Sequence, residues 1–354
     1  MADFHADRVE LRIDNDIYTG WTEVSIRRGL DSLFGEFDIT LASRARTGDA
    51  PWPLRAGARC SLGIDGEILI EGHIDRLRGS VNAGERTVNV SGRDLTADLA
   101  DCSAIHKPGS WRNVSLAKII SELVAPFGII VSIEADTGPN IRKFALQQGE
   151  SVWSAIERLL RFRALIGWTR GDGRLVITTP GKGAVVASLI EGANLLSVTG
   201  SHDVTERFAT YLVKGQASGS DERNGAAVAQ LSASASDPAI RRYRPLLVVA
   251  EEQADRASLQ KRADWEANVR AARSQPAEAI VQGWRDPSGA LWKADSRVKL
   301  IAPSAYIDSE MLVVGVTLER GFSGTIAILQ LERPEAWSQL PVPESADASA
   351  LGAA

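Results

Sequence analysis

The sequence predicts a mainly β protein with an α+β insert, in which two similar small β-barrels are separated by a helix-containing middle region. Three observations support this fold class. Short alternating apolar patterns fill the first 95 residues and return after residue 190, amphipathic helical patterns lie between them, and one hairpin pattern occurs near both ends of the chain.

Composition is that of a folded protein without a membrane segment. The chain has 354 residues, of which 44% are hydrophobic and 24% charged, and its formal net charge is -5. The acidic balance argues against a protein that mainly grips phosphates. No signal peptide precedes the first strand, and no window approaches the roughly 20 apolar residues that span a bilayer, so we expect folding in a cytoplasm without membrane insertion.

Residues 1–95 are predicted to form the first barrel. Val9, Leu11 and Ile13 alternate with polar residues, and the same period continues in later strands up to residue 94. The segment 43–57 is rich in turn-forming residues and is predicted to be a loop. Because no helical pattern intervenes, these strands should pair with one another.

Residues 96–190 are predicted to form the α+β middle region. One amphipathic helix follows Ser115, a plausible N-cap, and ends at Gly128. A second helix covers 151–162, and the strands after it turn at 171–173, where glycine and aspartate favour a hairpin.

The rest of the chain is predicted to hold a second barrel interrupted by a helix. The expected parts are a barrel formed by 191–235 and 277–335, a helical insertion at 236–276 and a disordered tail at 336–354. The insertion is polar, with a narrow apolar stripe at Leu259, Ala263, Ala267 and Ala271. Residues 216–226 are rich in glycine, serine and charged residues, so they are predicted to form a mobile loop.

The repeated hairpin suggests internal duplication. Cys60 aligns with Val298 at the start of the two copies, and Gly72 aligns with Gly315 further along; a basic residue, Arg76 or Arg320, follows. Alternating hairpins also resemble one another by chance, because few residue types suit a pleated, half-buried surface. The order of the strands around each copy favours duplication.

No residue pattern predicts catalysis, a metal or a cofactor. No histidine or cysteine follows any of the four histidines at a spacing of two to four residues; they are His5, His73, His106 and His202. Ser201, His202 and Asp203 are adjacent, so on a strand they point to opposite faces and cannot form a relay. The carboxylate pairs Asp98/Asp101 and Glu251/Glu252 are typical of solvated helix faces.

The cysteines and tryptophans are predicted to be structural. Cys60 and Cys102 both lie in apolar surroundings and are expected to be small buried side chains without a disulfide. Trp284 and Trp292 flank a turn and are expected to pack across a hairpin. Four more tryptophans lie in apolar patterns and are expected to pack in the core, and stacking on a sugar is the second interpretation: Trp21, Trp111, Trp153 and Trp168.

Several segments together resemble the baseplate hub proteins of contractile-tailed phages, especially the tail protein P type of Mu-like phages. The family is related to the T-even phage hub and to the hub part of type VI secretion spike proteins. The segments that carry the resemblance are residues 87–104, 115–129, 144–178, 203–216 and 281–300. The middle region also contains a helix-strand piece similar to LysM modules.

The resemblance implies a structural virion protein of the tail baseplate rather than an enzyme. It implies a homotrimeric ring with six similar β units, bound to the tail tube protein, the central spike protein and other baseplate proteins. DNA would pass through the channel without specific binding, and no catalytic, cofactor or metal residue is carried over.

Two alternatives remain open at this stage. A contractile bacteriocin or a type VI-like spike complex would use the same kind of hub. A peptidoglycan-binding or cell-wall-degrading tail protein is the less favoured alternative, since the sequence shows no activated nucleophile or metal cluster for it.

Overall fold

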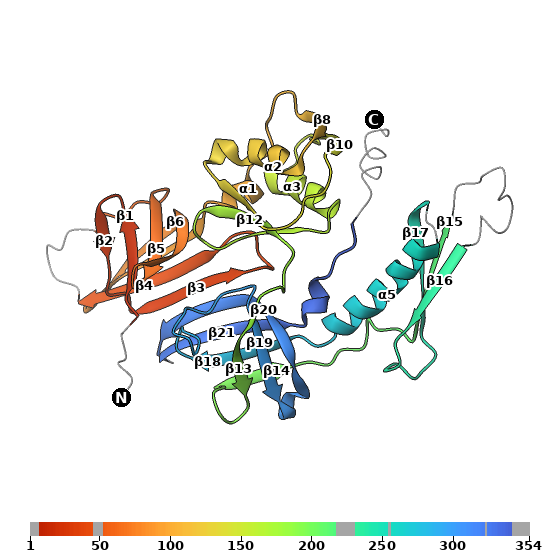
Figure 1. Ribbon diagram of the computed structural model, residues 1–354. Helices are drawn as coiled ribbons and strands as arrows, with labels where there is room; N and C mark the ends of the chain where they lie inside the picture. The colour runs from red at the N-terminus through yellow and green to blue at the C-terminus, as the bar shows by residue number, and fades with distance from the viewer. Residues whose placement is uncertain (1–6, 45–51, 217–230, 254–255, 323, 342–354) are drawn as a thin grey trace.

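Figure 1 shows the computed structural model of the chain, which describes residues 7–44, 52–216, 231–253, 256–322 and 324–341. Most of the β structure belongs to one 13-stranded sheet with the order β14-β18-β21-β20-β3-β4-β7-β6-β5-β1-β2, while β19 pairs with β20 and β13 pairs with β19. The closed barrels expected from the sequence are therefore wrong for the described residues, because β3 and β20 join both halves into one sheet.

The strands of the first half come from residues 9–94, and those of the second half come from residues 185–332. The first half contains β1 (Val9–Ile13), β2 (Asp16–Tyr18), β3 (Glu23–Gly29), β4 (Glu36–Arg44), β5 (Arg59–Ile64), β6 (Glu67–Val81) and β7 (Glu85–Asp94). The second half contains β13 (Val185–Ile190), β14 (Ser197–Gly200), β18 (Ala277–Gln282), β19 (Arg297–Ala302), β20 (Ile307–Gly321) and β21 (Gly324–Glu332).

The two halves have the same strand order, as the duplication predicts. The first half runs β3-β4-β7-β6-β5-β1 and the second runs β14-β18-β21-β20-β19-β13. In both halves the central hairpin begins with a strand of 15 residues, β6 or β20. The halves differ at one end, because β1 is antiparallel to β5 whereas β13 is parallel to β19.

A β-bulge at the same place in both hairpins fixes their true alignment. The register shifts between Ile74 and Arg76 in β6, and between Val313 and Gly315 in β20. The alignment of Cys60 with Val298 is confirmed, because they pair with the equivalent residues Gly72 and Met311. The alignment of Gly72 with Gly315 is wrong by four residues. A slip of four preserves the alternation of polar and apolar residues along a regular strand, so alternation in the sequence could not detect it.

The inner faces of both halves share one apolar core. Val88 and Val90 of β7 and the equivalent Ala327 and Leu329 of β21 are all buried in it. Each strand contributes alternate residues, as the period of two requires. Fully burying a leucine or valine side chain contributes about 1.5–3 kcal/mol, so this continuous core stabilises the two halves together.

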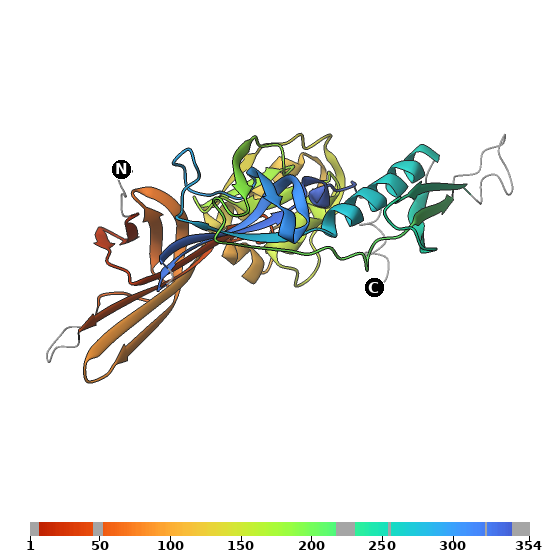
Figure 2. The ribbon, with the colours of Figure 1, turned by 90° about the horizontal axis from the view of Figure 1, so that it is seen from below.

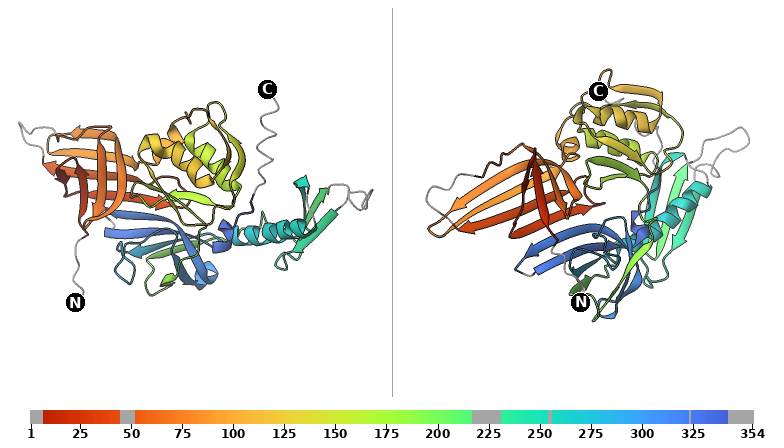
Figure 3. Two further views of the ribbon diagram at one scale, coloured as in Figure 1. Left: turned by 45° about the horizontal axis from the view of Figure 1, so that its top comes forward. Right: turned by 60° about the vertical axis from the view of Figure 1, so that its left-hand side comes forward.

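The middle region lies against one side of the sheet (Figure 3). Its elements are α1 (Ala97–Asp101), β8 (Ser110–Val114), α2 (Leu116–Val124), η1 (Ala125–Phe127), β9 (Ile130–Ile133), β10 (Ile141–Ala145), α3 (Val152–Arg161), β11 (Ile166–Thr169) and β12 (Arg174–Thr178). The predicted N-cap is confirmed, since Ser115 accepts a hydrogen bond from the Lys118 backbone N–H. The helix ends at Gly128, which has a φ of 68°.

A separate small unit projects beyond the second half of the sheet (Figures 1 and 2). It consists of β15 (Thr210–Gln216), β16 (Leu231–Ser236), β17 (Pro245–Gln253) and α5 (Arg256–Arg273), and is called the α5 unit below. Its strands form their own sheet in the order β16-β15-β17. This differs from the expectation that residues up to 235 belong to the second barrel. Alternation predicted the strands correctly, but it carries no information about their partners.

The predicted apolar stripe of α5 packs on this sheet. Leu259, Ala263 and Ala267 are buried, and Ala271 is half-buried. Leu259 and Ala263 contact a cluster that includes Val213 and Ala233.

The first residues of the expected disordered tail are ordered. A turn of 3-10 helix, η3 (Pro334–Trp337), follows β21, and Trp265 of α5 donates its Nε1–H to the Ser338 carbonyl at 2.9 Å. Arg273 of α5 donates to the Ala336 carbonyl at 3.4 Å. The tail thus begins by packing on the helix. Residues 342–354, and residues 217–226 of the expected mobile loop, lie outside the described residues.

The hairpin of β11 and β12 docks on the first half of the sheet through backbone groups. The predicted turn is confirmed, and the Gly171 carbonyl accepts from the Glu71 N–H at 2.6 Å. A Cβ at Gly171 would lie 1.6 Å from the Leu69 carbonyl oxygen, and its φ is +85°. Only glycine allows the two backbones to approach so closely.

We therefore expect Gly171→Ala to lower the free energy of unfolding by about 3 kcal/mol or more, from steric overlap added to left-handed strain. Gly66→Ala is the matched control, since its φ is +84° and a Cβ there meets nothing within 4 Å. The control should lose about 1–2 kcal/mol. Urea unfolding of both variants measures the difference, and equal losses would contradict the docking role.

A buried carboxylate fixes the chain where the sheet passes into the middle region. Asp94 is 2% exposed and accepts from the Gly35 N–H at 2.8 Å and the Thr96 N–H at 3.0 Å. Burial raises the pKa of Asp94, while these hydrogen bonds oppose the shift.

Asp94→Ala should lower the free energy of unfolding by about 2–4 kcal/mol, because it leaves two buried N–H groups unpaired. Asp38→Ala removes an exposed acceptor of Asn89 and should cost under about 1 kcal/mol. Thermal or urea unfolding of the two variants provides the measurement. A loss at Asp94 no larger than at Asp38 would show that the buried acceptor is dispensable.

Candidate functional site

The structural feature with the most extensive contacts between distant parts of the chain is the junction of β3 and β20. These strands pair antiparallel, with Gly29 opposite Gly315, Ile26 opposite Leu318 and Val24 opposite Arg320. A Cβ at Gly29 would lie 2.8 Å from the Val314 carbonyl oxygen. The junction thus uses backbone ladder bonds, apolar side chains and a glycine at the closest approach.

Ion pairs close one end of this junction. Arg285, in the loop after β18, binds Asp7 and Asp65 of the first half at 2.9 Å each. Lys293 of the second half lies 3.0 Å from Glu67. The Arg320 guanidinium stacks 4.4 Å from the ring centroid of Trp284, itself fully buried. The two halves are therefore joined by charge as well as by the sheet.

The outer surface of the sheet near the junction carries charges of both signs. A shallow hollow there crosses from β20 to β6 and is lined mainly by polar and charged side chains: Ser25, Arg27, Glu36, Phe37, Asp38, Asp75, Arg76, Ser91, Gly92, Arg93 and Thr317. Arg93 pairs with Asp75 at 2.6 Å and with Asp101 at 2.9 Å. Because the charges are mixed, the hollow has no basic character that would select nucleic acid.

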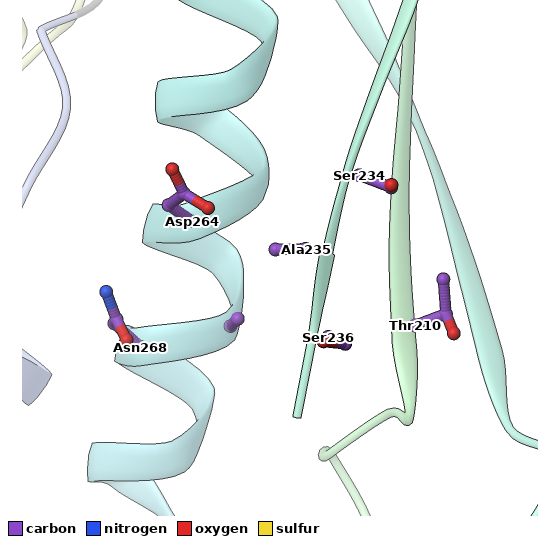
Figure 4. Close-up of a pocket in the computed structure, with 7 residues that line it drawn as sticks. Thr210, Ser234, Ala235, Ser236, Asp264 and Asn268 are labelled. Atoms are coloured by element: carbon purple, nitrogen blue, oxygen red, sulfur yellow. The ribbon is translucent and has the colours of Figure 1, made fainter. Parts of the chain in front are cut away.

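A second hollow lies between α5 and the sheet of its unit (Figure 4). Its lining is Thr210, Ser234, Ala235, Ser236, Asp264, Ala267 and Asn268. Asp264 accepts from Gln260 at 3.0 Å, and no histidine or cysteine stands among the described lining residues that could activate a serine. These groups offer hydrogen bonds but no nucleophile-base pair.

The histidines occupy separate places. His202 Nε2 lies 3.0 Å from the Tyr306 carbonyl, whereas the neighbouring Asp203 accepts from the Thr205 backbone and hydroxyl. The structure thus gives His202 and Asp203 different partners, as their adjacency predicts. His106 stacks on Trp111 at 4.8 Å, and His73 lies in β6. His5 lies outside the described residues.

The other residues singled out in the sequence are scattered. Asp101 pairs with Arg93, and the side chains of Glu251 and Glu252 lie outside the described part. Cys60 is buried, and burial raises its thiol pKa to about 12. Cys102 is exposed, so its predicted burial is wrong. The helix α1 ends just before it and turns the residue outward, which the apolar neighbours did not reveal.

The six tryptophans singled out in the sequence pack in the core or against it, as predicted. Trp284 and Trp292 are buried on either side of their turn, where the Trp292 N–H donates to the Trp284 carbonyl at 2.9 Å. Trp21, Trp111 and Trp168 are buried, and Trp153 is partly buried against the core of the middle region. None of them forms an exposed stacking platform. The pairing of β3 with β20 was not predicted from the sequence. The length of the β20 strand pattern was the one feature of the sequence that could have indicated it.

The arrangement suits assembly rather than chemistry. Within the described residues no group of histidine, cysteine and carboxylate side chains is placed to hold a metal ion. None of their helices combines the length and apolar character needed to cross a bilayer. The surfaces available for assembly are those of a long sheet with defined edges and of the projecting α5 unit.

Comparison with protein families gives matches along most of the chain. The Mu phage baseplate assembly protein GpP-like N-terminal family matches residues 8–94, and the baseplate hub protein gp44-like second domain matches 96–179. The tail protein NMB1110-like third domain matches 207–265, and the Mu phage baseplate assembly protein GpP fourth domain matches 255–339.

Whole-chain comparisons agree with the family matches. The baseplate hub protein gp44 of Escherichia phage Mu is 33% identical over 88% of this chain and 84% of its own length. A solved 43 kDa tail protein of prophage MuSo2 from Shewanella oneidensis is 31% identical, with a TM-score of 0.83 over 94% of this chain and all of the other. A tail protein from Neisseria meningitidis is 25% identical, with a TM-score of 0.77, covering 95% and 99% of the two chains.

More distant structures share the fold alone. The c3393 protein of E. coli, a type VI secretion component, is 11% identical with a TM-score of 0.57, covering 94% of this chain and 79% of that one.

The resemblance to phage hub proteins inferred from the sequence is confirmed by the relatives that are 31–33% identical to this chain. The chain belongs to the baseplate hub protein gp44/GpP family of Mu-like contractile phage tails, a structural, non-enzymatic family of the virion tail that assembles with other tail and baseplate proteins.

Proposed function

We propose that three copies of this chain form a closed ring that joins the tail tube to the central spike and surrounds a channel for DNA ejection. The observation that carries this proposal is the internal duplication of the sheet, in which each half has the same strand order. Three chains with two such halves give six similar units, so a threefold ring can match a sixfold tube. Cyclic symmetry closes such an assembly with one repeated interface.

The charge of the chain is compatible with passage of DNA. The net charge of -5 gives little attraction for phosphates, and a wall that binds DNA weakly would let it slide. The partners in this proposal are a second and third copy, the tail tube protein, the central spike protein and further baseplate proteins. Assembly would take place in the host cytoplasm before the part enters the virion.

We also propose that the chain works as four domains: the two halves of the sheet, the middle region and the α5 unit. Two family matches, 8–94 and 96–179, support the limits of the first half and the middle region, whereas the matches at 207–265 and 255–339 overlap within α5. The LysM-like description of the middle region stays an interpretation. A hub from a bacteriocin or from a phage would use the same domains.

The ring predicts a trimer in solution at high protein concentration. Size-exclusion chromatography with light scattering should give about three times the 38.0 kDa mass of the chain. Negative-stain images should then show a ring with a central hole. A protein that stays monomeric when concentrated, or a trimer without a hole, would contradict the proposal.

A further inference from the structure

One edge of β6 is unpaired over residues 76–81. β7 pairs with one edge of β6 from Gly72 to Val81. On the other edge β5 pairs as far as His73, and the residues just before β5 exchange backbone hydrogen bonds with Ile74. Beyond that point no strand in the described part of the chain pairs with this edge. The free segment is largely exposed, and Val81 at its end is 73% exposed. Unpaired edges of this kind are templates for another strand.

The duplicate of this free segment is paired within the same chain. The common bulge places Arg76 at the position of Gly315 and Val81 at that of Arg320. Residues 315–320 of β20 pair antiparallel with β3, in the junction described above. The β6 segment therefore has the position and direction of a strand that accepts a partner.

β14 is the duplicate of β3 and also has a free edge. Val24 of β3 pairs with Ile39, and Val198 of β14 pairs with Ala279, the residue equivalent to Ile39. Val24 thus corresponds to Val198. β3 pairs on both edges, with β4 and β20, whereas β14 ends the described sheet and pairs only with β18.

We propose that residues 76–81 of β6 in one copy pair antiparallel with β14, and the residues that continue it, in the next copy of this chain. Transferring the register of the β3–β20 junction places Val81 opposite Val198, Ser80 opposite Thr199 and Arg76 opposite Asp203. This inference rests on the proposed ring and identifies the interface that would close it.

The transferred register brings complementary side chains together. Directly opposed residues in an antiparallel pair share one face, so the Arg76 guanidinium would lie beside the Asp203 carboxylate. Val81 would be covered by Val198, which is half-buried against the core. The register was copied from residues 24–29 and 315–320 without reference to these charges, so their match is independent support.

The positions of the two edges suit a head-to-tail contact. β14 ends one side of the sheet path, whereas β6 lies in the other half of the sheet. Figure 2 shows the β6–β7 hairpin extending from the molecule on the side opposite the α5 unit. A single chain cannot bring these edges together without breaking the sheet between them, whereas a neighbouring copy can. Such a contact repeats round a ring and leaves no free copy of either edge.

A cysteine pair at opposed positions tests the interface in the full chain. Ser80→Cys with Thr199→Cys, in a Cys102→Ser background, replaces two exposed polar residues. Opposed Cα atoms in an antiparallel pair are about 4.5–5.5 Å apart, within the range of a disulfide. The matched control is Ser80→Cys with Leu196→Cys, whose partner lies three residues, or about 10 Å, out of register.

Oxidation of the matched pair should give covalent dimers and trimers on a non-reducing gel, and the control should stay largely monomeric on the gel. Light scattering under reducing conditions reports assembly of the same samples. A trimer whose matched pair does not cross-link more than the control would overturn this interface and leave the ring intact. A reduced protein that stays monomeric would overturn both proposals.

Charge exchange provides a second test of the same register. Arg76→Asp and Asp203→Arg should each weaken the assembly by about 3–10-fold in dissociation constant, and the double variant should recover most of the loss. Asp203 also accepts from Thr205 in its turn, so recovery in the double variant separates the ion pair from the turn. Additive losses without recovery would count against Arg76 facing Asp203.

Discussion

The pairing of β3 with β20 determines how the rest of this molecule is arranged. Along one edge, β20 pairs first with β19 and then, past its bulge, with β3, so a single strand belongs to both halves. A strand of 15 residues is long enough for both contacts. Because ladder bonds leave few free backbone groups at the junction, the halves are held at a fixed register.

The same junction also holds a buried arginine, whose charge is costly to remove from water. Arg28 of β3 is 8% exposed, and burial lowers the pKa of its guanidinium to about 10 against the opposing effect of nearby carboxylates such as Glu67. Its Nη1 donates to the Arg170 carbonyl at 2.9 Å, in the turn of the docked hairpin. Arg28 therefore links the junction to the middle region, and three parts of the chain meet at one side chain.

The sequence predicts what depends on local periodicity and misses what depends on partners. The cap at Ser115, the stripe of α5 and the turn at Gly171 follow from spacing, and the structure contains them all. Closed barrels were expected because alternation gives the face of each residue but not the partner of each strand. The four-residue slip between Gly72 and Gly315 has the same cause, since only the bulges reveal the register.

Duplication within one chain also allows the two halves to differ where a ring of identical subunits could not. In the first half, residues 30–35 connect β3 to β4; the equivalent connection from β14 to β18 spans residues 201–276 and contains the α5 unit. Loops between paired strands accept such insertions because the ladder on either side is unchanged. In the ring proposed above, the covalent link would make one of every two junctions intramolecular, which would remove part of the association cost. Only the remaining junction would then need a partner copy, and within the described residues its strands, β6 and β14, have free edges.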